Sequence, residues 1–252
     1  MSEKWEKVSI VLPTLNETFS FKQTIDIILD ECDHEDLKEF VVVICDRTEK
    51  ESLRVIAQCR KALKGGEIPM RVIRQKHPGA GGATMDGITA SHGSHILMMA
   101  PDLETDPHLV KTFIETSKKY PDDMITASRW KEKGSFEGYS KVKYVLNFLF
   151  QKMFAIYYGV ELTDITFGFR LAPASILQNI RWEETGHPFF LETGLKPIRL
   201  GVTIHEIPAT WNARQEGESQ NSLLKTFKYL GIAIRARFEK KEDIIRKDRR
   251  QK

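Results

Sequence analysis

Short apolar runs rich in β-branched residues alternate with segments of helical periodicity over the first half of the chain, and this alternation constrains the fold more than any other feature. The predicted strands are residues 8–12, 40–45, 70–73, 95–100 and 124–128. The predicted helices between them are residues 21–29, 53–63, 82–90 and a helix that starts at Asp106-Pro107, with Asp106 as its N-cap. Continuous apolar strands separated by helices are typical of a parallel sheet covered on both faces, so we expect a three-layer α/β/α fold with a mostly parallel sheet.

The pattern changes after Ser128. A polar loop over residues 131–140 precedes a very apolar helix, Val142 to Tyr158, and a last strand is predicted at residues 203–207. Polar residues interrupt the apolar helix, so we expect no membrane-spanning segment. The first seven residues are charged and lack an apolar core, so we expect no secretory signal.

The net charge of +3 conceals an uneven distribution. Residues 221–252 hold 11 basic and 4 acidic side chains, whereas the first 220 residues have a net charge of −4. We therefore expect a mildly acidic body, residues 1–220, and a basic segment, residues 221–252. The near-balance of the whole chain argues against a nucleic-acid partner. Three cysteines without paired spacing favour a reducing compartment, and we expect a cytoplasmic protein.

The basic segment predicts an amphipathic helix with apolar residues on one stripe, namely Leu223, Phe227, Leu230, Ile234 and Phe238. Such a helix either packs on the body of the protein or binds an anionic membrane surface, and the basic residues around it favour the second partner. We therefore expect a peripheral protein on the cytoplasmic face of a membrane.

Polar, charged or glycine-rich residues follow each of the five predicted strands. These residues are 13–17, 46–48, 76–82, 101–106 and Arg129. Because ligands of open α/β sheets bind at the carboxyl ends of the strands, the five segments together predict a cleft for a polar, phosphorylated ligand.

These segments resemble, in order and spacing, the family 2 glycosyltransferases with the GT-A fold, which is Rossmann-like. The similarity is greatest to the dolichol- and polyprenyl-phosphate mannosyl- and glucosyltransferases. It rests on residues 8–17, 79–83, 102–104, 128–129, 164–170 and 206–208, followed by 214–219. The resemblance implies a single GT-A domain that binds a nucleoside-diphosphate sugar and transfers its hexose, with inversion, to an acceptor.

The resemblance also implies which residues bind the donor. They are Pro13, Thr14, Asn16, Glu17 and Asp46 for the nucleoside, with Gly79 and Gly81 in a turn nearby. The alternative for Glu17 is a carboxylate that favours a helix N-terminus, and Asp46 is equally suited to an ordinary strand-end turn. The Gly79-Ala80-Gly81 turn also resembles a dinucleotide fingerprint. However, Thr84 occupies the third glycine position and the turn does not follow the first strand, which argues against a dehydrogenase.

Asp102 and Glu104 form the predicted metal site. Carboxylates at i and i+2 of an extended segment project to the same side and suit one Mg²⁺ or Mn²⁺ ion that also binds a diphosphate. Such an ion would neutralise charge on the leaving nucleoside diphosphate. Ala100 stands where the family has the first aspartate, and the alternative is an acidic loop that caps a helix.

Arg129 and Arg214 are predicted to bind phosphate, because guanidinium groups contact phosphate oxygens bidentately. Two further basic positions of the family are Lys143 and Gln220 here. Asp164 is a candidate general base for a hydroxyl acceptor, whereas an anionic lipid phosphate needs no base. The predicted catalytic set is therefore Asp102, Arg129, Asp164 and Arg214.

We expect a polyprenyl phosphate acceptor at the cytoplasmic membrane face. Two alternatives stay open: transfer to a hydroxyl of a glycan or small molecule, and a non-catalytic relative that binds nucleotide sugars, suggested by Ala100 and Gln220. Residues 178–182 spell the Gln-x-x-Arg-Trp motif of processive synthases, which we interpret as coincidence. We do not interpret His92 and His95 as a metal pair.

Overall fold

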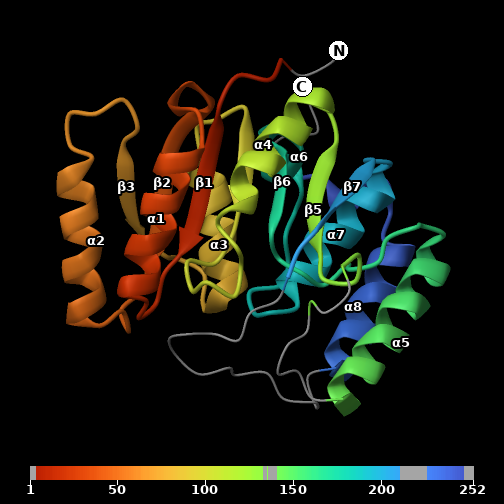
Figure 1. The fold of residues 1–252 in the computed structure, drawn as a ribbon. Coiled ribbons are helices and arrows are strands. Elements are labelled where there is room, and N and C mark those ends of the chain that lie inside the picture. Colours follow the sequence, from red (N-terminus) through yellow and green to blue (C-terminus); the bar gives the residue numbers. More distant parts are fainter. Residues whose placement is uncertain (1–3, 133–134, 136–140, 211–225, 247–252) are drawn as a thin grey trace.

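The computed structural model describes residues 4–132, 135, 141–210 and 226–246. Its centre is a seven-stranded sheet of order β3-β2-β1-β4-β6-β5-β7 (Figure 1). The strands are β1 (Val8–Pro13), β2 (Leu37–Ile44), β3 (Met70–Arg74), β4 (His95–Met98), β5 (Met124–Ser128), β6 (Arg170–Pro173) and β7 (Ile204–Pro208). The larger helices are α1 (Phe19–Glu31), α2 (Lys50–Ala62), α3 (Gly79–Ala90), α4 (Leu109–Lys119), α5 (Lys141–Tyr158), α7 (Phe189–Leu200) and α8 (Thr226–Phe238). Shorter turns are η1 (His34–Asp36), α6 (Ala174–Asn179) and α9 (Lys241–Ile244).

Six of the seven strands run in the same direction. β1 pairs in parallel with β2 and β4, β2 with β3, and β5 with β7. β6 lies antiparallel between β4 and β5 and joins the two halves of the sheet. The predicted mostly parallel, three-layer architecture is confirmed, although β6, α6 and α7 were not predicted.

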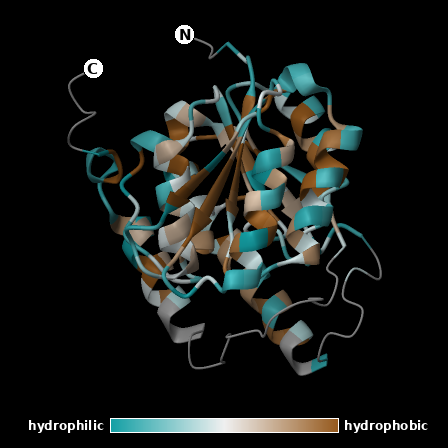
Figure 2. Cartoon of the chain, turned by 90° about the vertical axis from the view of Figure 1, so that its left-hand side faces the viewer, coloured by the Kyte–Doolittle hydropathy of each residue, from teal (hydrophilic) through white to brown (hydrophobic). Residues whose placement is uncertain are grey.

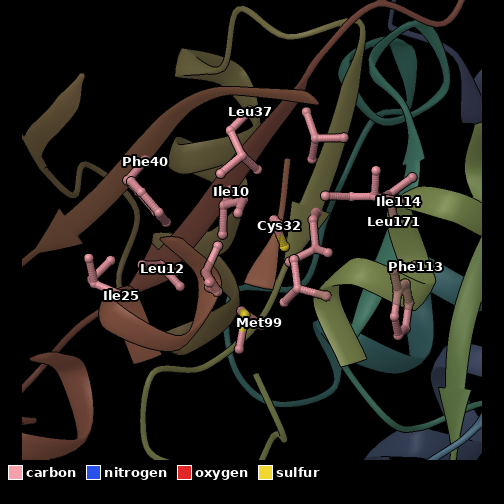
Figure 3. Close-up of a cluster of buried hydrophobic side chains, with 14 of the residues drawn as sticks. Ile10, Leu12, Ile25, Cys32, Leu37, Phe40, Met99, Phe113, Ile114 and Leu171 are labelled. Carbon is pink, nitrogen blue, oxygen red and sulfur yellow. The ribbon is translucent and has the colours of Figure 1, made fainter. Parts of the chain in front are cut away.

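Helices cover both faces of the sheet, and alternate strand residues point to opposite faces. Ile10 and Leu12 of β1 pack in a core with side chains of α1, α2 and α4. Figure 3 shows part of this core, with Ile25, Phe113 and Ile114 beside the strand residues. Val11 points the other way, into a core with side chains of α3, α6 and α7. The strands are consequently apolar on both faces, with the polar surface on the outside of the helices (Figure 2).

The predicted starts of α1 to α4 differ from the observed ones by two or three residues, and two of the differences have a clear cause. α4 begins at Leu109 rather than at Asp106-Pro107, because a turn precedes it in which Leu109 N donates to Asp106 O. The Asp106 carboxylate accepts from His108 N at 3.0 Å, so its side chain still satisfies a backbone donor at this end. α3 begins at Gly79 rather than Gly82, so the glycine turn forms the first turn of the helix.

α5 and α8 lie side by side next to α7 (Figure 1). Phe154 and Tyr158 of α5 share a buried cluster with Ile232, Ala233 and Ala236 of α8. Of the predicted apolar stripe of α8, Leu230 packs against this cluster, whereas Ile234 and Phe238 are exposed. Leu223 and the side chain of Phe227 lie outside the described residues. Among the described residues, no helix combines the length and apolarity needed to cross a bilayer.

Candidate active site

The carboxyl ends of six strands meet along one edge of the sheet. Strand order reverses between β1 and β4, since β2 and β3 continue on one side of β1 and the later strands lie beyond β4. In open α/β sheets this switch point is where ligands bind. The loops after β1 and β4, which contain residues 13–17 and 101–106, flank it. These candidate residues therefore lie at the carboxyl-end edge of the sheet, as expected.

The loops that follow β1 and β2 form one bonded unit. Asn16 Nδ2 donates to Glu49 Oε1 at 3.0 Å, and Glu49 N donates back to Asn16 Oδ1 at 3.0 Å. Thr14 N donates to Val43 O at 2.9 Å. Glu17 Oε2 accepts from Leu15 N at 2.6 Å, so this carboxylate stabilises the loop itself. Pro13, Thr14, Asn16 and Glu17 are thus held in one rigid turn, through a partner, Glu49, that sequence reasoning missed.

Asp46 lies at the carboxyl end of β2 and forms an ion pair with Arg74 at the end of β3. Both side chains are largely exposed, so the pair is screened by solvent. Its position at the edge of the sheet agrees with either interpretation, nucleoside contact or strand-end residue. Arg74 was not predicted, because nothing in a short apolar strand identifies which terminal charge faces its neighbour.

The segment with Asp102 and Glu104 is a turn, not the extended run that we expected. Leu103 has a φ of +60°, which is uncommon for a residue other than glycine, asparagine or aspartate. Glu104 N donates to Asp102 Oδ1 at 3.1 Å across this turn. A backbone held in such a conformation is typical of functional sites, where the surrounding structure fixes it. The Asp102 side chain is buried and Leu103 nearly so, which fixes the turn in place.

The donor set of this turn fits a small hard cation only in part. Within the described ranges, no group of three or more His, Cys, Asp or Glu residues is placed to bind a metal. Two carboxylates nevertheless suit Mg²⁺, which is often bound by one or two carboxylates together with substrate phosphates. The residues present therefore fit a cation that arrives with a diphosphate rather than a site that binds metal by itself.

Arg129 and Asp164 form a buried pair between the end of β5 and the segment before β6. Arg129 Nε donates to Asp164 Oδ2 at 2.6 Å and Nη2 donates to Oδ1 at 2.9 Å. Arg129 N, Gln151 Nε2 and Thr166 Oγ1 also donate to the same carboxylate. A carboxylate has about four acceptor sites. The five donors therefore occupy Asp164 fully, which was not foreseen in assigning it as a general base.

Glu206 of β7 accepts hydrogen bonds from the segment that carries Asp164. Its Oε1 accepts from Thr163 N at 2.7 Å and from Asp164 N at 2.9 Å, and its Oε2 accepts from Thr163 Oγ1 at 2.9 Å. The Glu206 side chain is only 2% exposed. The carboxylate of Glu206 therefore sets the backbone that presents Asp164. The sequence signal for Glu206 was its place in the quoted motif, but its role was missed.

Arg170, at the start of β6, is completely buried beside this network. Its guanidinium donates to Thr126 Oγ1, Phe190 O and Ile165 O, and also to Thr193 Oγ1. Burial lowers the pKa of Arg170 to about 10, against the opposing effect of Asp164 and Glu206. Arg170 thus acts as a structural cation that ties β6 to α7.

The glycines after β3 are required for close packing against the segment before α7. A Cβ on Gly81 would lie 2.4 Å from Phe189 Cβ, and one on Gly79 would lie 2.5 Å from Thr185 O. Gly82 N donates to Thr185 O at 2.8 Å. This chain therefore fills the space beside both glycines, and donor binding near Gly79 and Gly81 stays a prediction.

Several predicted residues lie outside what the structure describes. Arg214 and Gln220 belong to residues 211–225, and the side chain of Lys143 is likewise not described. The Gln-x-x-Arg-Trp segment is structural: Gln178 Nε2 donates to Ile88 O and Ser91 O, and Arg181 contacts Glu239. The expectation that this motif is a coincidence thus agrees with its position away from the strand ends.

Comparison with known proteins gives a family match and matches to curated relatives. The model of the family described as Glycosyl transferase family 2 matches residues 9–181. An undecaprenyl-phosphate mannosyltransferase from Micrococcus luteus is 27% identical over 224 residues, which are 86% of this chain and 88% of that protein.

Solved structures with a similar fold include glucosyl-3-phosphoglycerate synthase from Mycobacterium tuberculosis. Its complex with uridine diphosphate has a TM-score of 0.68 and 17% identity, covering 92% of this chain and 80% of that chain. Its complex with Mn²⁺, UDP-glucose and phosphoglyceric acid has a TM-score of 0.68 and 16% identity, covering 92% and 79%. At this identity the likeness concerns the fold.

Proposed function

This chain belongs to glycosyl transferase family 2 and is a glycosyltransferase, and from this premise we propose that it transfers a hexose from a nucleoside-diphosphate sugar to a polyprenyl phosphate. The relative from Micrococcus luteus supports the proposal, since its name states a lipid-phosphate acceptor. The observation that carries the proposal is the state of Asp164, whose carboxylate is saturated with hydrogen-bond donors.

A saturated carboxylate is poorly suited to deprotonate an incoming hydroxyl group. Asp164 is fully buried, and the donors around its carboxylate leave no acceptor site for a substrate proton. A phosphate monoester is already an anion at neutral pH and needs no base. The arrangement around Asp164 therefore favours an anionic acceptor over a hydroxyl acceptor.

The neighbourhood of Arg129 also favours an acceptor that is charged at one end and apolar at the other. The Arg129 guanidinium lies 4.7 Å from the centroid of the Phe167 ring. The next residue, Trp130, packs against Tyr144 and Phe148 of α5, with ring centroids 4.8 and 5.4 Å apart. An aromatic path thus leads from the cationic residue to the apolar helix α5, as a lipid phosphate would require.

The transfer step needs no proton movement at the acceptor. A phosphate oxygen of the lipid attacks C1 of the sugar from the side opposite to the leaving group. The new C–O bond forms as the bond from C1 to the nucleoside diphosphate breaks, which inverts the configuration. Asp102 and Glu104 would hold Mg²⁺ or Mn²⁺. When bound, that ion supplies positive charge to the departing diphosphate. The mycobacterial complexes with these ions support this choice of cofactor. Arg214 stays a predicted phosphate contact.

A product analysis tests the acceptor. The protein is incubated with Mn²⁺ and either UDP-glucose or GDP-mannose, together with a short polyprenyl phosphate or with phosphoglyceric acid. We expect glycosylated lipid phosphate, and no product with phosphoglyceric acid. Transfer to phosphoglyceric acid but not to the lipid would overturn the proposed acceptor.

The same assay tests the metal site. Asp102→Asn removes one of the two carboxylates and should abolish Mn²⁺-dependent transfer, while Glu115→Gln, on the exposed side of α4, should not.

We further propose that the protein works as a peripheral protein on the cytoplasmic face of a membrane. The basic excess of residues 221–252 and the lipid nature of the proposed acceptor support this location.

A further inference from the structure

α5 is apolar on both of its sides. Its inner side, with Phe154 and Tyr158, is buried against α7 and α8. On its opposite side four residues recur at helical spacing and are exposed: Val145, Leu149, Met153 and Ile156, at 54%, 57%, 43% and 81%. We define these four residues as the α5 outer face. A helix that is apolar all round is normally buried in a core or in a membrane, so we expect a partner to bury this face.

The exposure is concentrated in one region. Of the thirteen large apolar side chains exposed in the described part of the chain, eight lie on α5 and two on α8. Single exposed apolar residues are normal, but a contiguous apolar patch of this kind marks an interaction surface. Both helices extend beyond the carboxyl ends of the strands, on the side of the candidate active site (Figure 1).

The charges on α5 and α8 indicate what kind of partner would bind the α5 outer face. α5 and α8 together carry six basic residues and no Asp or Glu: Lys141, Lys143, Lys152, Lys228, Arg235 and Arg237. Acidic residues follow both helices, Glu161 after α5 and Glu239 after α8, and Arg235 is already paired with Glu184. An apolar face flanked by cations is typical of helices that lie in the interface of an anionic bilayer. Two copies joined through this face would bring the same cations together, so a self-association surface is disfavoured.

We propose that the α5 outer face inserts into the headgroup region of an anionic lipid bilayer, with α5 parallel to the membrane plane. Lys152, on the same side of the helix as Leu149 and Ile156, would contact lipid phosphates. The inference deepens the proposed function and rests on it for its purpose, since Trp130, the neighbour of Arg129, packs on Tyr144 and Phe148 of the same helix. It differs from the expected contact through residues 221–252, because it assigns the insertion to α5.

Vesicle sedimentation tests the surface without substrates. The full chain is mixed with vesicles of phosphatidylcholine alone or of phosphatidylcholine with phosphatidylglycerol. We expect binding to the anionic vesicles, and a loss of affinity of about tenfold or more for the double variant Leu149→Glu, Ile156→Glu. The matched control is Leu53→Glu, which places the same charge at a half-exposed apolar position on α2 and should bind as the original chain does.

A second variant reports on insertion without adding charges that could unfold the protein. Ile156→Trp keeps the face apolar, and its emission should shift to the blue when anionic vesicles are added. Unchanged binding by the double variant, or no binding by the original chain, would overturn the proposal. So would a dimer in solution that the double variant dissociates. Because these vesicles contain no polyprenyl phosphate and no donor, failure here is separate from failure of the transfer assay.

Discussion

Arg129 and Asp164 meet through two parallel hydrogen bonds, Nε to Oδ2 and Nη2 to Oδ1, at 2.6 and 2.9 Å. This fork joins the carboxyl end of β5 to a segment 35 residues later in the chain. Only a planar guanidinium provides two donors in that geometry. The orientation of the cation at the candidate acceptor site is therefore fixed by a carboxylate whose own acceptor sites are used up in holding it.

Removing Asp164 should destabilise the protein strongly. Asp164→Ala is expected to lower the free energy of unfolding by about 3–5 kcal/mol, because it leaves the mostly buried Arg129 without its partner. Urea denaturation measures the change. Asp46→Ala serves as the control, since it removes an exposed partner of Arg74 and should cost about 0–1 kcal/mol. Equal losses in the two variants would contradict the buried pair.

Glu206 should act on transfer through Asp164. In Glu206→Gln one of the two carboxylate oxygens becomes an amide that cannot accept, so the bonds to Thr163 and Asp164 N weaken. We expect a loss of about 1–3 kcal/mol in unfolding free energy and a lower kcat/KM. Glu161→Gln, at an exposed position, should change neither quantity. Full activity in the Glu206 variant would show that the segment is held by other contacts.

The same substitution should have opposite effects at two glycines. Gly201 ends α7 with a φ of +89°, so Gly201→Ala is expected to destabilise the fold by about 1–2 kcal/mol. Gly231 lies exposed within α8 with open space around it, so Gly231→Ala should stabilise the protein by about 0.5–1 kcal/mol. Denaturation curves of both variants check the signs, and shifts in the same direction would refute these backbone assignments.

Alkaline pH should destabilise the protein partly through Cys32. Burial raises the pKa of this thiol from 9.0 to about 12. Between these values the folded state keeps a proton that the unfolded state loses, so stability falls as pH rises from about 9 to 12. Unfolding free energies of Cys32→Ala should therefore fall less steeply with pH over that window. Between pH 6 and 8 the slopes of the two proteins should coincide. Parallel slopes at high pH would show that the thiol does not contribute.

Strands with uninterrupted apolar runs were predictable, because burial on both faces leaves a direct trace in the sequence. β6 left no such trace, since it has four residues and begins with Arg170, a charge that only the surrounding carbonyl and hydroxyl acceptors make tolerable. α7 was missed for a similar reason. Its Glu192 and Lys196 are buried and paired at 2.7 Å, whereas a pattern of hydropathy assigns charged residues to the surface.

The location of the candidate site could be predicted from the sequence, whereas most of the contacts within it could not. The edge of the sheet follows from strand order, and the residues at it follow from the loops. The positive φ of Leu103 left no signal in its residue type, and the saturation of Asp164 depends on side chains from distant segments, such as Gln151 on α5. Likewise, Gly81 indicates that another part of the chain packs closely against its backbone, but the sequence does not show that this part is Phe189.

The antiparallel strand β6 has a consequence for synthesis on the ribosome. β5 ends at Ser128, yet the strands that pair with it, β6 and β7, begin at Arg170 and Ile204. β1 to β4 can associate as they emerge, while β5 waits for about forty further residues before a neighbour exists. During that interval an apolar strand and the open edge of β4 are available to other chains, a hazard that chaperones counter. Nascent chains stalled before Pro173 should therefore be the most prone to aggregate.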